Sequence, residues 1–274
     1  MKTIMEIMNM IDLQEEVKTL VIKEMNYLNF ANLENDIKDL LEIKIANDAK
    51  NRLVEALQPD ENNMKILACM LYALTFTYEK YQEMQIPDEI FIETMKAFKR
   101  FLNEYYEGNK TWKFDREWWT YRQIAMTIFR IGELEYEMKE DENNNKFISM
   151  HIPSDANLKR EKVIESIKAS FSFFSKYYPM YSNVEYRCKS WLLSSDLKKL
   201  LPSTSNILNF QTLFVIKDEV YGQNGFIKWI YKTYYDNYLD LPEDTTLQRN
   251  LKQHLLNGGS VSVALGILKK EIIL

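Results

Sequence analysis

Glycine is distributed very unevenly along this chain of 274 residues, and this limits what its first part can fold into. Residues 1–107 contain no glycine, and all seven glycines lie at position 108 or later. Helices tolerate the absence of glycine, whereas hairpin turns usually need it. Apolar residues in this segment recur at the spacing of amphipathic helices, as in Ile66, Leu67, Met70 and Leu74. The sequence therefore predicts an all-helical N-terminal domain over residues 1–114.

From Ile131 the apolar pattern changes from a helical period to a period of two. Three glutamates alternate with Leu134, Tyr136 and Met138, which predicts a strand with one apolar and one polar face. A polar turn at 141–145 leads into a second alternating segment, which predicts a hairpin. Strands and helices then alternate, so we expect residues 115–274 to form a mixed β-sheet with helices on its faces. The whole chain is thus predicted to be α+β.

Composition excludes several classes of protein. The net charge is −5, with −6 on residues 1–114 and +1 on the rest, so we expect no nucleic-acid partner. No apolar run approaches the roughly 20 residues that span a bilayer, and the N-terminus is not typical of a signal peptide. The sequence predicts a cytoplasmic protein without a membrane partner. Formation of a homo-oligomer stays open.

Cysteine and histidine are too few for a disulfide framework or a metal centre. The two cysteines, Cys69 and Cys188, lie in different predicted domains. The two histidines, His151 and His254, occur in no zinc-binding motif, so we expect no metal site. No serine-hydrolase, P-loop or Rossmann motif is present in the sequence.

His151, at the end of the second predicted strand, is the best single candidate for acid–base chemistry, because histidine titrates near neutral pH. Glu135 lies on the polar face of the neighbouring predicted strand and could approach it within the hairpin. The register of the two strands cannot be fixed from the sequence. A structural, hydrogen-bonded histidine is the alternative interpretation.

The segment after Pro153 predicts a phosphate site. A strand leads through Ser154–Asn157 into a helix, whose N-terminal N–H groups can bind an anion. Lys159, Arg160 and Lys162 add positive charge at the same place. Solvated cations in an ordinary first helical turn are the alternative.

Cys188 is a second candidate for chemistry, because Arg187 and Lys189 flank it and could lower its pKa. Side chains of neighbouring strand residues point to opposite faces of the sheet, however. This favours a buried, inert thiol.

Several motifs in this order resemble a bacterial family of two-domain acyltransferase-like proteins. The family has a helical N-acyltransferase N-terminal domain and a GNAT-like C-terminal domain. The resemblance extends from Arg122 to Gly259. It is carried by RQ...FRIGELEYEM, HIP, C-x-S-W-L-L, S-x-L-x-x-L-L-P, S-N-I-x-x-F-Q, D-T-T-L-Q-R and H-L-L-N-G-G.

The resemblance implies a GNAT-type fold for the second half and a donor such as acetyl-CoA or another acyl-CoA. In that superfamily the pantetheine arm pairs with the backbone of a splayed strand, and the diphosphate binds the next helix N-terminus. Carried over, the strand is Phe147–Ile152, with Ser149 and Ile152 as contacts. The phosphate site is Ser154–Lys162, which includes Ser154, Asn157, Lys159, Arg160 and Lys162.

The implied reaction is acyl transfer from a CoA thioester to an amine on a small molecule or peptide. An amine must lose a proton before it attacks a thioester, and Glu135 or His151 is the expected base. Ser190 or Cys188 is expected near the leaving sulfur. The alternative is a catalytically inactive GNAT-shaped binding or regulatory protein, which is favoured because the segment Ser154–Asn157, directly after Pro153, contains no glycine.

Overall fold

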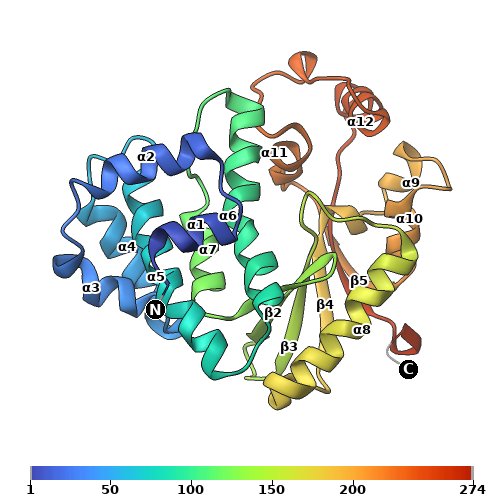
Figure 1. Cartoon of the computed structure of the whole chain (residues 1–274). Coiled ribbons are helices and arrows are strands. Elements are labelled where there is room, and N and C mark those ends of the chain that lie inside the picture. Colours follow the sequence, from blue (N-terminus) through green and yellow to red (C-terminus); the bar gives the residue numbers. More distant parts are fainter. Residues whose placement is uncertain (1, 273–274) are drawn as a thin grey trace. The chain divides into compact units, whose positions relative to one another are not determined.

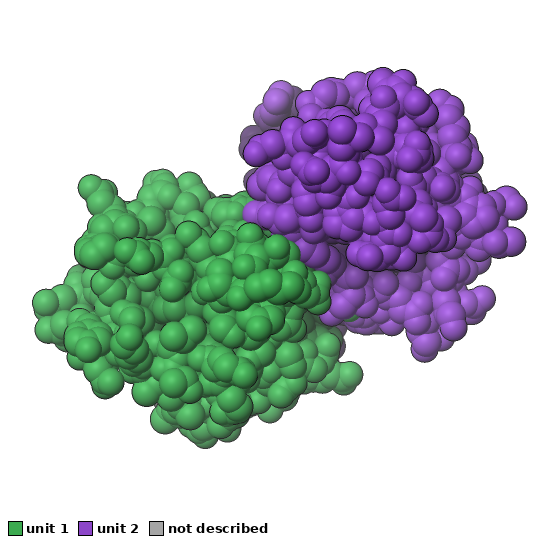
Figure 2. Space-filling model, turned by 90° about the horizontal axis from the view of Figure 1, so that it is seen from above, with its two compact units in different colours: residues 1–130 green, residues 131–274 purple. Residues whose placement is uncertain are grey.

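The computed structural model describes residues 2–272 and contains two compact units, Met1–Arg130 and Ile131–Leu274 (Figure 2). The sequence placed the domain boundary at 114/115, before the helix Glu117–Ile124, which packs within the first unit. The segment Ile128–Ile131 (β1) contains the point at which one unit ends and the next begins.

The first unit is built from helices, as the glycine-free sequence predicts. They are Ile4–Met10 (α1), Glu15–Met25 (α2), Phe30–Asp39 (α3), Ile43–Ala56 (α4), Met64–Glu83 (α5), Asp88–Asn109 (α6) and Glu117–Ile124 (α7).

Helix α5 forms the centre of this unit and contacts α1, α2, α3, α6 and α7. Its buried residues occur on every side of the helix, which is expected of a helix surrounded by others. The Asp60 carboxylate accepts hydrogen bonds from the backbone N–H groups of Lys65 and Ile66, at 3.2 and 3.0 Å. It thereby satisfies donors that the first turn of α5 leaves without intrahelical partners.

The second unit alternates strands and helices (Figure 1). The strands are Leu134–Glu140 (β2), Lys146–His151 (β3), Glu185–Ser190 (β4), Phe214–Val220 (β5) and Val263–Leu268 (β6). The α-helices are Arg160–Tyr177 (α8), Leu197–Leu200 (α9), Asn206–Gln211 (α10), Gly225–Tyr231 (α11) and Thr246–Leu256 (α12). Short 3₁₀ helices are Pro179–Tyr181 (η1), Trp191–Leu193 (η2), Tyr238–Asp240 (η3) and Lys270–Ile272 (η4).

The sheet is mixed, with the strand order β1-β2-β3-β4-β6-β5. β3 pairs antiparallel with β2 and parallel with β4, and β6 pairs antiparallel with both β4 and β5. A parallel pair needs a crossover connection, and α8 supplies it along one face of the sheet (Figure 1). Ser166 and Ser170 of α8 contact the phenol groups of Tyr136 and Tyr186, at 2.8 and 3.3 Å.

A second apolar cluster packs beside the sheet and unites α9, α11 and α12. Its buried members are Leu197, Leu200, Phe226, Ile227, Tyr231, Leu241, Leu251, Leu255 and Val261. Trp191, directly after β4, packs against the cluster. Among residues 2–272, no helix has the length and apolar character needed to cross a membrane.

The expected α+β class and the mixed sheet are confirmed, but one local prediction is wrong. Glu135 and Glu137 share one face of β2, as the alternation predicts, and that face is buried, since the two residues are only 3% and 5% exposed. The helix after Pro153 begins at Arg160 rather than directly after Ser154–Asn157, because a turn and an extended segment intervene.

Gly132, between β1 and β2, should resist substitution. Its φ is +63°, and a Cβ atom there would lie 3.0 Å from the Cβ of Ser166. We expect Gly132→Ala to lower the free energy of unfolding by about 1–3 kcal/mol, through backbone strain and the clash with α8. Urea denaturation measures this. Gly225→Ala is the control, because nothing lies within 4 Å of the added methyl group; equal losses in the two variants would contradict the explanation.

Asp141 should make the hairpin turn sensitive to acid. Its Oδ1 accepts hydrogen bonds from the backbone N–H groups of Asn143 and Asn145, both at 3.0 Å. The bond from Asn145 is the main reason why the pKa of this carboxyl lies below its usual 3.8. The stabilisation is therefore present above the unfolded-state pKa and is lost as pH falls through the folded-state value.

Thermal melts of wild type and Asp141→Asn across the acid range test this. Asparagine keeps an acceptor but cannot ionise. We expect the variant to melt lower near neutral pH and the two melting curves to converge in strong acid. A constant difference at every pH would contradict this role.

Candidate active site

The strands β3 and β4 part at the end of β3. They pair from Phe147↔Glu185 to Met150↔Cys188, and within the described chain the register goes no further. Beyond that point each strand keeps its other neighbour: His151 pairs with Glu135 of β2, and Lys189 and Ser190 pair with Leu265 and Ala264 of β6. A gap in backbone pairing therefore opens beside His151, inside an otherwise continuous sheet.

His151 and Glu137 form a hydrogen-bonded pair at this place. The imidazole Nε2 lies 2.8 Å from Oε2 of Glu137. The side chain of Glu137 is only 6% exposed, whereas that of His151 is 21% exposed and can reach solvent or a ligand. When Glu137 is ionised, its carboxylate can only accept, which places the ring proton on Nε2 and leaves Nδ1 as the basic nitrogen of the neutral ring.

The strand register places the expected neighbour, Glu135, beside His151 and adds a second glutamate, Glu137, to the site. Glu135 lies directly opposite His151, and Glu137 lies opposite Ser149. All four residues share one face, because positions two apart on a strand do. The histidine ring leans along the strand to Glu137, which Lys139 also contacts at 3.2 Å. The alternation of β2 placed Glu137 on the correct face, but nothing in the sequence singled it out.

Cys188 lies in the core of the sheet. It is fully buried, and burial raises the pKa of its thiol to about 12. Neighbouring Arg187 does not lower that value, since its guanidinium lies over the Phe147 ring and bonds Glu185. The structure thus agrees with the inert thiol rather than with a nucleophile.

Ser190 ends β4 within the segment that has parted from β3. Its Oγ accepts a hydrogen bond from the Leu192 N–H at 3.1 Å and caps the 3₁₀ helix η2. A hydroxyl that accepts still has a proton to donate. Ser190 therefore keeps the chemical capacity expected of a donor to a leaving sulfur.

The loop between β3 and α8 differs from the predicted phosphate site. The backbone N–H of Asn157 donates to Oε2 of Glu133 at 2.8 Å, so a protein carboxylate already occupies that amide. The Asn157 side chain accepts from the Lys159 N–H at 3.1 Å. An anion near Ser154–Asn157 would have to displace Glu133.

The N-terminus of α8 begins at a residue that does not cap it. The N-cap residue, Lys159, makes no side-chain capping hydrogen bond, and Asp155 lies four residues before it. Arg160 donates to Oγ1 of Thr212 at 3.2 Å, and Lys162 pairs with Glu165 at 2.9 Å. Both cations are exposed, so these contacts are weak and can be exchanged for a phosphate.

Within residues 2–272, no group of three His, Cys, Asp or Glu residues could hold a metal ion. The chemistry available at the site is thus that of a histidine–carboxylate pair, a hydroxyl, strand backbone beyond the β3–β4 register and a helix N-terminus.

The two thiols should be unreactive in the folded chain. Burial raises the pKa of both Cys69 and Cys188 to about 12. Very little thiolate is then present at pH ~8. We expect a thiol reagent such as DTNB to label neither cysteine before denaturation and both afterwards. Fast native labelling that disappears in Cys188→Ala would contradict the burial of Cys188.

Two protein families match the chain. Residues 2–126 match an N-acyltransferase N-terminal domain, and residues 128–268 match a GNAT-like C-terminal domain. No curated protein matches the sequence.

Solved structures of acyltransferases share the fold. One, in complex with decanoyl-CoA and teicoplanin, has a TM-score of 0.78 and 16% identity, over 96% of this chain and 86% of its own. A mutant in complex with octanoyl-CoA has a TM-score of 0.80 and 15% identity, over 96% and 86%. A structure with CoA and 10C-teicoplanin has a TM-score of 0.69 and 19% identity, over 74% of this chain. This chain spans 65% of the length of that last protein.

The GNAT-like match alone covers just over half of the chain, and the helical match covers nearly all of the remainder. The chain therefore belongs to the two-domain family that joins an N-acyltransferase N-terminal domain to a GNAT-like C-terminal domain.

Proposed function

We propose that this protein transfers a medium-chain acyl group from a CoA thioester to the amine of an acceptor. The observation that carries the proposal is the parting of β3 and β4 after Met150 and Cys188. A thioester arm needs an extended backbone with free hydrogen-bonding groups, and a strand that loses one neighbour provides it. The solved relatives in complex with octanoyl-CoA and decanoyl-CoA support a donor of this length.

In the proposed reaction, His151 accepts the proton of the attacking amine. The nitrogen lone pair then forms a bond to the thioester carbon, and the carbonyl π electrons move onto oxygen. Glu137 holds the ring at Nε2, so that Nδ1 takes the proton. The buried carboxylate also stabilises the imidazolium that results.

The tetrahedral intermediate then collapses and the C–S bond breaks. Ile152, the last residue before Pro153, can offer its backbone N–H to the oxyanion. The thiolate leaves with its electron pair and takes the proton from the imidazolium of His151, through the Ser190 hydroxyl or a water molecule, which returns His151 to its neutral form. The diphosphate of CoA would lie at the N-terminus of α8, where the helix dipole favours an anion. Arg160 and Lys162 would give up their contacts with Thr212 and Glu165 and bind the phosphates instead.

The acceptor is proposed to be an amine on a large, ring-bearing molecule. Two of the solved relatives were determined in complex with teicoplanin or an acylated form of it. Acetyl-CoA is a weaker candidate donor than octanoyl-CoA or decanoyl-CoA, because the relatives' donors carry longer chains.

A GNAT-shaped binding protein without catalysis is the second candidate. The bond between Glu133 and the Asn157 N–H favours it, because a carboxylate there opposes a phosphate. Both candidate functions require the protein to bind acyl-CoA. Thermal melts with and without octanoyl-CoA test this shared requirement. Saturating ligand at 100 times Kd should stabilise the fold by about 2.7 kcal/mol. Binding without turnover of any amine would favour the second candidate.

Release of CoA from octanoyl-CoA in the presence of amine acceptors tests the catalytic roles. We expect His151→Ala to lower kcat by about 10²–10⁴, through loss of the base. Glu137→Gln should lower it by about 10- to 100-fold, through loss of ring orientation. Both effects should appear in kcat with a smaller change in KM for the donor.

Glu140→Gln is the matched control, because Glu140 lies on the same strand, is exposed and pairs with Lys146 at 2.7 Å. It should leave kcat unchanged. Full activity of both His151→Ala and Glu137→Gln would remove the proposed base from the mechanism.

A further inference from the structure

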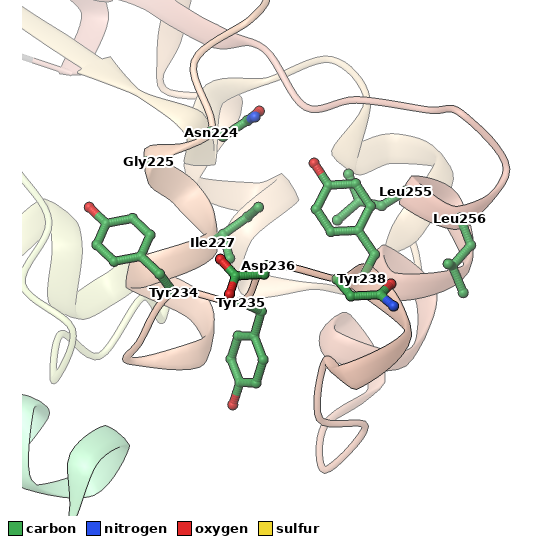
Figure 3. A pocket seen from close by; sticks show the side chains of 10 residues that line it. Asn224, Gly225, Ile227, Tyr234, Tyr235, Asp236, Tyr238, Leu255 and Leu256 are labelled. Atoms are coloured by element: carbon green, nitrogen blue, oxygen red, sulfur yellow. The ribbon is translucent and has the colours of Figure 1, made fainter.

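A hollow of about 610 Å³ lies in the second unit (Figure 3). It is formed by α11, the segment that follows α11, η3 and the last turn of α12. Its polar lining consists of Asn224, Tyr234, Tyr235, Asp236, Asn237 and Tyr238, and Ile227, Leu255 and Leu256 supply apolar surface. Such a mixture of rings and a few polar groups is typical of small-molecule sites.

Most polar groups of this hollow form no hydrogen bond within the protein, although the rings of Tyr235 and Tyr238 pack against the apolar cluster. In the described chain, Asn224, Asp236 and the phenol groups of Tyr234, Tyr235 and Tyr238 make no side-chain hydrogen bond or ion pair. Asn237 is the exception, since it caps η3 by accepting from the Leu239 N–H at 3.0 Å. Tyr234 is 69% exposed, a large aromatic surface left in water. Their hydrogen-bonding capacity is therefore available to a ligand.

The arrangement of these side chains limits which ligand fits. The rings of Tyr234 and Tyr238 lie on opposite sides of the hollow, with the Asp236 carboxylate and Ile227 between them (Figure 3). Lys228 lies next to the hollow, with its Nζ 5.3 Å from the centroid of the Tyr234 ring, but the charged residue in the lining itself is Asp236, whose carboxylate opposes the phosphates of CoA. An acyl chain would desolvate Asp236 without offering it a hydrogen bond.

A sugar ring satisfies every group present. Its faces carry C–H groups that pack on aromatic rings, and its edges carry hydroxyl groups that donate to a carboxylate or an amide oxygen. An amino group on the ring would pair with Asp236 through a charge-assisted hydrogen bond.

Packing links the hollow to the end of β4. Ile227 and Leu255, which line it, also belong to the apolar cluster against which Trp191 packs. Trp191 follows Ser190 directly, and Val261 of the same cluster lies just before β6. Since β4 and β6 are antiparallel, both places lie at the end of the sheet where β4 has left β3.

We infer that the hollow binds a glycosyl ring of the acceptor, at a distance from the amine that is acylated. That the sugar is part of the acceptor rests on the proposed function, whereas the binding of a sugar to the hollow does not. The ring is held between Tyr234 and Tyr238, and Asp236 accepts from its hydroxyl or ammonium groups.

Saturation-transfer NMR with glucose and glucosamine, in the absence of CoA, tests the inference on the full chain. We expect transfer to the protons of both sugars. Tyr234→Ala and Tyr238→Ala should each weaken binding by about threefold to tenfold, the loss of one aromatic contact. Asp236→Asn should weaken glucosamine more than glucose, because only glucosamine is cationic.

Tyr27→Ala is the control, since Tyr27 is an equally exposed tyrosine at 74% in the helical unit. It should leave sugar binding unchanged. No transfer to either sugar, or binding that all variants retain, would overturn the inference. Failure of the sugar-binding inference can be told apart from failure of the proposed function, because stabilisation of the fold by octanoyl-CoA is measured separately. That stabilisation should be the same in all of these variants.

Discussion

The pairing between β3 and β4 is the constraint on which the account depends. Parallel strands must be joined by a crossover, and α8 makes that crossover from the end of β3 to the start of β4. The first part of each strand is paired, which fixes the sheet. Pairing then stops, because β3 stays with β2 while β4 stays with β6. One sheet thus provides both a rigid frame and unpaired backbone at its interior.

Burial of charge gives this gap its chemical character. Glu135 and Glu137 are nearly inaccessible on β2, although an isolated buried carboxylate is costly. Glu137 is compensated by His151 and Lys139. A buried pair of this kind adds little to the free energy of unfolding. Its presence is better explained by the orientation that it gives to the imidazole ring. The loop before α8 is less suited to an anionic ligand. There the Asn157 N–H already donates to the Glu133 carboxylate, so this amide is not available to a phosphate.

Much of the fold was predictable from the sequence, and the details of the site were not. The lack of glycine before residue 108 indicated helices, and alternation around Tyr136 indicated a strand. His151 was singled out because histidine titrates near neutral pH and because it ends a predicted strand. Its contact with Glu137 depends on register and on a ring rotamer, which no local pattern determines. The start of α8 at Arg160 was missed because the Asn157–Glu133 bond, between distant positions, holds the preceding segment extended.

A crystal structure with a thioether analogue of octanoyl-CoA, in which the thioester cannot be cleaved, tests the central claim most directly. The account predicts that the pantetheine arm lies along the backbone of His151 and Ile152, in the gap between β3 and β4, with the diphosphate at the first turn of α8. An analogue bound elsewhere, with β3 and β4 paired beyond Met150 and Cys188, would contradict it.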